Sequence, residues 1–228
     1  MKKTPTFPVY LLVLVATVSV LVTGCKKESD EPSVIKDGDG NVYTSVKIGT
    51  QSWLAENLKT TKLNDGTSIP LVTDYTEWKN LATPGYCWYN NDKATYGNTY
   101  GPLYNWYAVE TGKLCPKGWH VPSNDEMVDL DLFVVDKVGG KLKEMGTTHW
   151  RTPNTGATDQ YGFKALPGGY RDLTFFDDIY SYGAWWTCSE RTQLNYGYVS
   201  ILIYDTDNWS PYAEVHKNFG YSVRCLKD

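Results

Sequence analysis

The stretch LCPKGWHVPSNDE, residues 114–126, leads from a cysteine through a Gly-Trp-His sequence into the start of a helix. Ser123 and Glu126 form the pattern of a capping box, in which each side chain satisfies a free backbone N–H of the first helical turn. The segment before them is the extended entry to the helix, stiffened by two prolines. Apolar residues follow at helical spacing at Met127, Leu130, Phe133, Val134 and Val138. The pattern predicts a helix that ends at Gly139-Gly140.

Two further helices are predicted upstream of this segment. In YGPLYNWYAVETG, residues 100–112, helical spacing connects Leu103, Trp106, Tyr107 and Glu110, and Gly112 is a plausible stop. The stretch from 64 to 100 is irregular, with one possible short helix near 76–81.

Strand patterns lie at both ends of the mature chain. Residues 37–58 begin with Asp-Gly turns and then alternate, which places Val42, Thr44, Val46 and Ile48 on one face of a hairpin strand. Asp37, Asp39 and Asn41 also resemble the opening of a calcium loop, but its later ligands are missing, so a plain turn is favoured. The last third contains four strand-like runs, at 184–190, 196–204, 212–216 and 220–226. The fold class expected is α+β.

The first residues have the features of a bacterial lipoprotein signal peptide. Lys2 and Lys3 precede an apolar run over 9–22, which is short for a membrane span. The sequence LVTGC that ends at Cys25 resembles a lipobox, so residues 1–24 are expected to be removed and Cys25 lipidated; an ordinary secretory signal is the alternative. Residues 25–36 are then a flexible tether, and 37–228 a single domain.

The acidic cluster Glu28, Asp30 and Glu31 resembles signals that send lipoproteins to the cell exterior. We therefore expect an outer membrane lipoprotein exposed at the cell surface, held in the membrane by its anchor; a periplasm-facing anchor is the alternative.

Composition limits the partners of the mature chain. Of the 228 residues, about 204 remain after removal of 1–24, which suits one domain. Loss of Lys2 and Lys3 moves the net charge from −4 to about −6. Such a surface matches phosphate backbones poorly, so no nucleic acid partner is expected.

Four cysteines remain in the mature chain: Cys87, Cys115, Cys188 and Cys225. In an oxidising compartment an even count favours disulfides, but four cysteines allow three pairings, and the sequence does not choose among them. None of them has the Cys-x-x-Cys spacing of a zinc site or a redox dithiol.

Six motifs occur in a fixed order: DGNVYTSVKIGTQSWLAENL, YCWYNND, YGPLYNWYAV, LCPKGWHVPSNDE, GFKALPGGYRD and GYSVRCLKD. Together they resemble the Fibrobacter succinogenes major paralogous domain, over about 37–228. The resemblance implies a C-type-lectin-like fold, in which two helices pack on antiparallel sheets and long loops support a surface. It also implies a bridge between Cys115 and Cys225. Trp119 would then fill the core, and His120 would be a packed, hydrogen-bonded histidine.

Cys188, in the stretch WWTCSE, is a departure from the residues that the family pattern has at this place. Cys87 and Cys188 are therefore either a second disulfide pair or two free thiols. Formylglycine-generating oxidases share the general fold and need two close thiols that bind copper. An oxidase-like enzyme that uses Cys87 and Cys188 is therefore the alternative to a non-enzymatic function.

Other chemistries find little support. A calcium-dependent sugar site would need a Glu-Pro-Asn or Gln-Pro-Asp triplet, and neither is present. The three histidines, at 120, 149 and 216, belong to no nucleophile motif. We therefore expect no catalytic residues, no metal and no cofactor.

The expected function is binding, since the mature chain interleaves Tyr, Trp, Asn, Ser and Asp, the residues that recognition surfaces favour. Trp185 and Trp186 are expected in the core. The candidate ligand-binding residues, for a glycan or protein ligand, are Tyr180, Tyr182, Asp207, Asn208, Trp209 and Tyr212. A further hypothesis is a surface receptor diversified by a retroelement, because the C-terminal region is rich in the residues that such elements vary.

Overall fold

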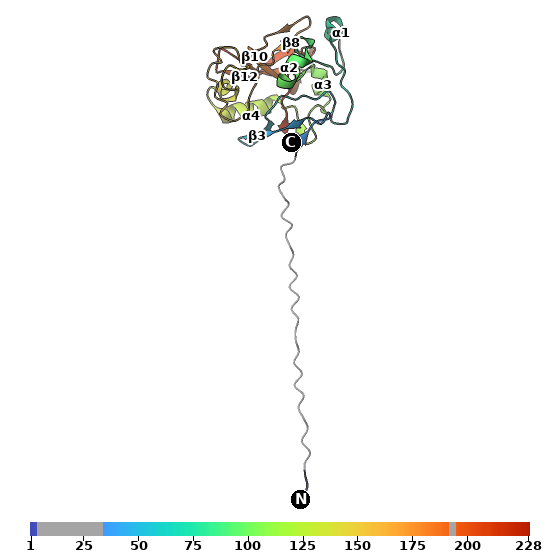
Figure 1. Cartoon of the computed structure of the whole chain (residues 1–228), viewed down its shortest axis with the longest axis vertical. Coiled ribbons are helices and arrows are strands. Elements are labelled where there is room, and N and C mark those ends of the chain that lie inside the picture. The colour runs from blue at the N-terminus through green and yellow to red at the C-terminus, as the bar shows by residue number, and fades with distance from the viewer. Residues whose placement is uncertain (4–33, 192–194) are drawn as a thin grey trace. The chain divides into compact units, whose positions relative to one another are not determined.

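A computed structural model of the chain describes residues 1–3, 34–191 and 195–228. Residues Val34–Asp228 form one compact unit of helices and antiparallel sheets, which is an α+β arrangement (Figure 1). Cys25, the signal segment and most of the expected tether lie outside the described residues. Among the residues that are described, no helix has both the length and the apolar character needed to cross a bilayer.

The compact unit begins with a hairpin of β1 (Ile35–Lys36) and β2 (Val42–Tyr43). The Asp37 carboxylate accepts hydrogen bonds from the backbone N–H groups of Asp39 and Asn41 and from the Tyr43 hydroxyl. The predicted turn is thus confirmed. The first strand starts at Ile35, inside the segment that was expected to be a flexible tether.

Strand β3 (Ser45–Ile48) and strand β4 (Gln51–Leu54) follow as a second hairpin. The prediction that one face runs from Val42 to Ile48 is wrong, because the strand is interrupted at Thr44. Val42 is exposed, whereas Tyr43 and Ile48 are buried. The interruption therefore changes which residues point inward.

The two ends of the compact unit meet in a four-stranded sheet of order β3-β4-β13-β7. Strand β7 (Trp119–His120) belongs to the entry segment of the long helix, and β13 (Leu226–Lys227) is the last strand. Strand β13 is shorter than the strand predicted over 220–226. Cys115 and Cys225 form a disulfide beside this sheet, 110 residues apart in sequence, as the family resemblance implied. Trp119 is half-buried against the core.

The capping box is present at the start of α4 (Asn124–Val134), as predicted: the Ser123 hydroxyl accepts from the Glu126 N–H, and the Glu126 carboxylate accepts from the Ser123 N–H. The predicted helix end is wrong. Helix α4 stops at Val134, because residues 135–137 all have positive φ, and α5 (Val138–Leu142) contains both glycines of the predicted stop. Phe133, expected on the buried face, is 51% exposed.

The middle of the chain supplies short elements. They are α1 (Tyr75–Lys79), β5 (Tyr86–Cys87), the 3-10 turn η1 (Tyr89–Asn91), α2 (Lys93–Tyr100), β6 (Leu103–Tyr104) and α3 (Trp106–Glu110). Helix α1 matches the short helix expected near 76–81. Leu103 lies in a strand rather than a helix, because α3 begins only after Asn105, whose side chain accepts from the Ala108 N–H.

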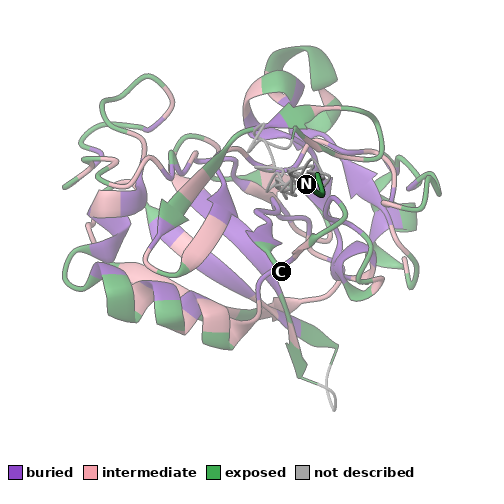
Figure 2. Cartoon of the chain, turned by 90° about the horizontal axis from the view of Figure 1, so that it is seen from below, coloured by how far each residue is buried: buried purple, intermediate pink, exposed green. Residues whose placement is uncertain are grey.

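The last third contains a three-stranded antiparallel sheet of β10 (Tyr182–Arg191), β11 (Tyr196–Ile203) and β12 (Trp209–His216). It is preceded by the small hairpin of β8 (Tyr170–Arg171) and β9 (Phe176–Asp177). Trp185 and Trp186 are buried, as predicted. Figure 2 shows the buried strands in the middle of the unit and exposed residues on the outer side of α4.

Two buried arginines join the loops to this core. The Arg224 guanidinium donates to the backbone oxygens of Leu54 and Phe163, and that of Arg171 donates to the backbone oxygens of Val72, Thr73 and Asp74. Carbonyl oxygens accept from the terminal nitrogens of these arginines, while within the described residues the buried Nε of each has no partner. Each arginine thus fixes the path of a loop at the cost of desolvating a cation.

Candidate ligand-binding site

Tyr180 lines an open hollow on the loop surface. Tyr180 is 43% exposed, and its ring makes an edge contact with the ring of Tyr100 in α2, with 6.3 Å between ring centroids. Tyr180 has φ of +67°, a conformation that bulky residues rarely adopt. Two backbone hydrogen bonds hold it there, from Tyr180 N–H to the Pro167 oxygen and from Arg151 N–H to the Tyr180 oxygen. An exposed aromatic ring held in an unfavourable backbone state marks a candidate functional position.

The hollow beside Tyr180 has a volume of about 530 Å³. Two segments line it, residues 147–151 and residues 179–181. His149 is held between the Glu144 carboxylate, at 2.8 Å from Nδ1, and the ring of Tyr100. The Arg151 guanidinium lies 5.2 Å from the centroid of the Tyr204 ring. Both side chains are therefore positioned by neighbours that lie outside the hollow.

Several polar groups of the hollow remain available to a ligand. Within the described residues, the hydroxyls of Thr147, Thr148 and Ser181 make no hydrogen bond. The same holds for His149 Nε2 and for the Arg151 guanidinium. An aromatic face surrounded by unused donors and acceptors is suited to a polar ligand such as a saccharide.

Comparison with known proteins identifies the family to which the chain belongs. The model of the Fibrobacter succinogenes major domain matches residues 46–227, nearly the whole compact unit. The chain belongs to this family. No curated protein and no solved structure matches it.

In this Fibrobacter succinogenes major domain, the predicted binding residues do not form one site. Tyr180 lines the hollow, but Tyr182 is half-buried, with its ring 5.7 Å from that of Tyr170. Trp209 was expected to be exposed and is half-buried against the core, where its indole N–H donates to the Ser200 hydroxyl. Tyr212 is 49% exposed on the sheet of β10, β11 and β12. That these residues bind a ligand stays a prediction.

Asp207 and Asn208 belong to the turn between β11 and β12, which is packed tightly against α5. The buried Lys143 ammonium donates to the backbone oxygens of Ile203 and Thr206. A side chain on Gly139 would place its Cβ 2.1 Å from the Asn208 oxygen. Burial lowers the pKa of Lys143 to about 8. The turn thus serves as a joint between the sheet and the helix.

The sequence-based prediction missed residues 147–151, which are five of the eight residues that line the hollow. The stretch GTTHWRTP has no regular period, and His149 was considered only for catalysis. The sequence did contain a signal for this segment. A turn glycine is followed by two threonines, and the polar residues His149 and Arg151 flank the aromatic Trp150.

His120 has a structural position, as the resemblance implied. Its Nδ1 lies 2.7 Å from the Asp228 carboxylate and its Nε2 lies 2.9 Å from the Glu126 carboxylate. Partial burial opposes protonation, but these two hydrogen bonds outweigh it and raise the pKa of His120. The histidine therefore connects the chain end to the first turn of α4.

Cys87 and Cys188 are free thiols in the described part of the chain. Cys87 is buried in an apolar cluster with Trp78 and Leu103, and burial raises its pKa to about 12. Cys188 is exposed, and its backbone N–H donates to the Pro122 oxygen. Of the two alternatives that the sequence left open, the structure has the free thiols. Its described His, Cys, Asp and Glu residues form no group of three able to hold a metal ion.

Proposed function

We propose that this protein is a cell-envelope lipoprotein whose domain binds a glycan or a protein ligand through the hollow at Tyr180 and does so without catalysis. The observation that carries the proposal is the hollow itself: an exposed aromatic ring, fixed by its backbone, beside hydroxyl groups, the Nε2 of His149 and the guanidinium of Arg151, which make no hydrogen bond within the described residues. A ring that is already ordered loses little conformational entropy when a ligand stacks on it.

The finer fold assignment, C-type-lectin-like, belongs to the same proposal. Two features support it: the helices α3 and α4 accompany antiparallel sheets, and the Cys115–Cys225 disulfide joins the entry of α4 to the last strand. In such an arrangement the loops of the middle region are free to display a binding surface.

The proposed location is the outer membrane, with the anchor at Cys25 and the domain exposed at the cell surface. The support comes from the sequence: a basic and apolar leader that ends in LVTGC, followed by charged residues. Labelling with radioactive palmitate, with Cys25→Ser as the comparison, tests the anchor.

The binding proposal is tested with a glycan array and with a pull-down from extracts of neighbouring cells. The full-length protein should be compared with Tyr180→Ala, which removes the exposed ring. Phe175→Ala is the matched control, because Phe175 is 49% exposed and does not line the hollow. Binding that is lost in Tyr180→Ala and kept in Phe175→Ala supports the proposal. Absence of any ligand, or a ligand indifferent to Tyr180, would overturn it.

A further inference from the structure

A row of aromatic rings leads away from the Tyr180 hollow. Tyr96 is the next ring, since burial and then the neighbouring Tyr180 hydroxyl raise the pKa of Tyr96. The centroid of the Tyr89 ring is 5.1 Å from that of Tyr96 and 5.5 Å from that of Phe176. Phe176 is in turn 6.2 Å from Tyr75. The row thus connects α2 with the hairpin of β8 and β9 and with α1, which Figure 1 shows at the top of the unit.

The two ends of the row are more open to a ligand than its middle. Tyr75 is 42% exposed and Tyr180 is 43% exposed. Tyr96 and Phe176 are half-buried, and Tyr89 is buried beneath them. A ligand that follows the row can therefore stack on the two end rings and contact the exposed parts of Tyr96 and Phe176. Tyr89 supports these rings from below.

The buried Arg171 fixes the end of the row at α1. Its guanidinium carbon lies 5.0 Å from the centroid of the Tyr75 ring and 5.1 Å from that of Phe176. The same guanidinium donates to backbone oxygens of residues 72–74, which lead into α1. Both rings are therefore ordered before a ligand arrives, and ordered rings lose little conformational entropy when a ligand stacks on them.

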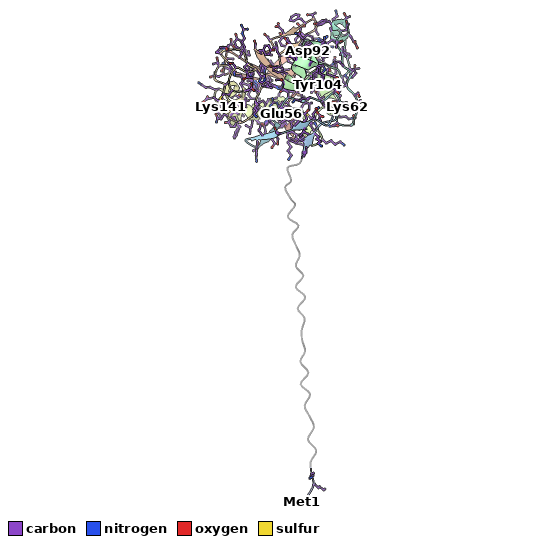
Figure 3. The ribbon with its side chains drawn as sticks, in the orientation of Figure 1. Met1, Glu56, Lys62, Asp92, Tyr104 and Lys141 are labelled. Carbon is purple, nitrogen blue, oxygen red and sulfur yellow. A yellow bond between two sulfur atoms is a disulfide. The ribbon has the colours of Figure 1, made fainter. Side chains whose placement is uncertain are left out.

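Close packing of the chain against Tyr89 fixes the middle of the row. Gly169 has φ of +61°, and a Cβ there would lie 2.9 Å from the Tyr89 ring and 2.5 Å from the Asp177 oxygen. Helix α2, which carries Tyr96, is held at its start by Asp92, labelled in Figure 3. The Asp92 carboxylate accepts from the N–H and the hydroxyl of Thr95. The positions of the rings are thus set by the backbone.

The charge beside the middle of the row is negative. Asp177 and Asp178 directly follow Phe176, and both are exposed. Neither forms an ion pair within the described residues. Lys79 and Arg151 belong to the two ends, on α1 and in the hollow. Carboxylates can accept hydrogen bonds from sugar hydroxyls, but they repel the negative groups of an acidic polymer that passes them.

We propose that the row from Tyr180 to Tyr75 binds an extended, neutral polysaccharide, which stacks on the two end rings and hydrogen-bonds to the carboxylates between them. This inference rests on the proposed function, because the Tyr180 hollow supplies one end of the site. It goes further in naming the ligand class and in extending the site to α1. Since four ring-to-ring steps separate the ends, a disaccharide reaches one end ring, whereas a hexasaccharide reaches both and binds more tightly.

The test is calorimetric titration of the full-length protein, purified in mild detergent, with neutral oligosaccharides of two lengths. The pairs are cellobiose and cellohexaose, maltose and maltohexaose, and mannobiose and mannohexaose, and hexagalacturonate is the acidic comparison. At least one neutral hexasaccharide should bind at least about tenfold more tightly than its disaccharide, because its second contact is intramolecular. It should also bind more tightly than hexagalacturonate.

Tyr75→Ala should lower the affinity for that hexasaccharide to about the affinity for the disaccharide. Tyr75→Leu should do the same, because it keeps an apolar side chain against Phe176 and removes the flat ring. Tyr212→Ala is the matched control and should bind as the parent does, because Tyr212 is 49% exposed and its ring pairs with Tyr198, outside the row. Melting temperatures show that each variant is folded.

Three results would overturn the inference: no binding of any neutral hexasaccharide at millimolar concentration, tighter binding of hexagalacturonate, or hexasaccharide affinity that is unchanged in both Tyr75 variants. Binding that is lost in Tyr180→Ala but kept in the Tyr75 variants would limit the site to the hollow, so the inference would fail while the proposed function stands. A protein found as the ligand, with no neutral hexasaccharide bound, would have the same meaning. A ligand indifferent to Tyr180→Ala would overturn both.

Discussion

Replacing both Cys115 and Cys225 with serine is expected to lower the free energy of unfolding by about 5 kcal/mol, the chain-entropy value for a loop of 110 residues. Both sulfurs are buried in the main core cluster, so the new hydroxyls would add a penalty for unpaired polar groups. Domains of this size are stable by about 5–15 kcal/mol, so the loss is a large fraction of the total. The double variant should be close to its unfolding threshold at 37 °C.

The assay is urea unfolding followed by tryptophan fluorescence, for the parent and the double variant. Cys188→Ser is the matched control, because Cys188 is an exposed free thiol, and its replacement should change the free energy of unfolding by no more than about 0.5 kcal/mol. If the double variant unfolds at the same urea concentration as the parent, the claim that this bridge stabilises the fold is refuted.

Three further predictions concern stability. Hydrogen bonds raise the pKa of His120 in the folded state. Protonated His120 therefore stabilises the fold fully below about pH 6.5, and this contribution is lost as pH rises through the raised pKa. Melting curves at pH 5.5 and 8.5 should show a loss of about 0.5–1 kcal/mol in the parent and none in His120→Gln. Burial raises the pKa of Tyr104 and Tyr221, so stability should fall above about pH 10, where the unfolded tyrosines ionise; urea midpoints that stay constant from pH 9 to 11 would contradict this. Gly139→Ala should cost more than about 2 kcal/mol in urea unfolding, because its Cβ would overlap the backbone oxygen of Asn208; a cost within error of zero would show that the joint is loose.

Local sequence patterns predicted local structure well. The capping box at Ser123 and Glu126 placed the start of α4, because capping depends only on neighbours in sequence. Its end was missed, since Val135 and Lys137 adopt positive φ without a glycine that would indicate it. Helix α2 was missed for a related reason: its stretch KATYGNTY has no apolar period and contains a glycine.

The candidate site was harder to predict, because contacts between distant segments create it. Tyr180 was identified by its composition alone, whereas residues 147–151 reach it only in the folded chain. Trp209 was misjudged because nothing local shows that its indole meets Ser200 across the sheet. The family resemblance, by contrast, gave the Cys115–Cys225 bridge, which spacing could not choose. The retroelement hypothesis stays a prediction, and a neighbouring template repeat and reverse-transcriptase gene would support it.

The most direct measurement of the central claim is hydrogen–deuterium exchange of the full-length protein with and without the tightest ligand from the array. The account predicts slower exchange in residues 147–151 and 179–181, which line the hollow at Tyr180. Protection confined to other segments, such as 205–216, would show that the ligand binds elsewhere and would contradict it.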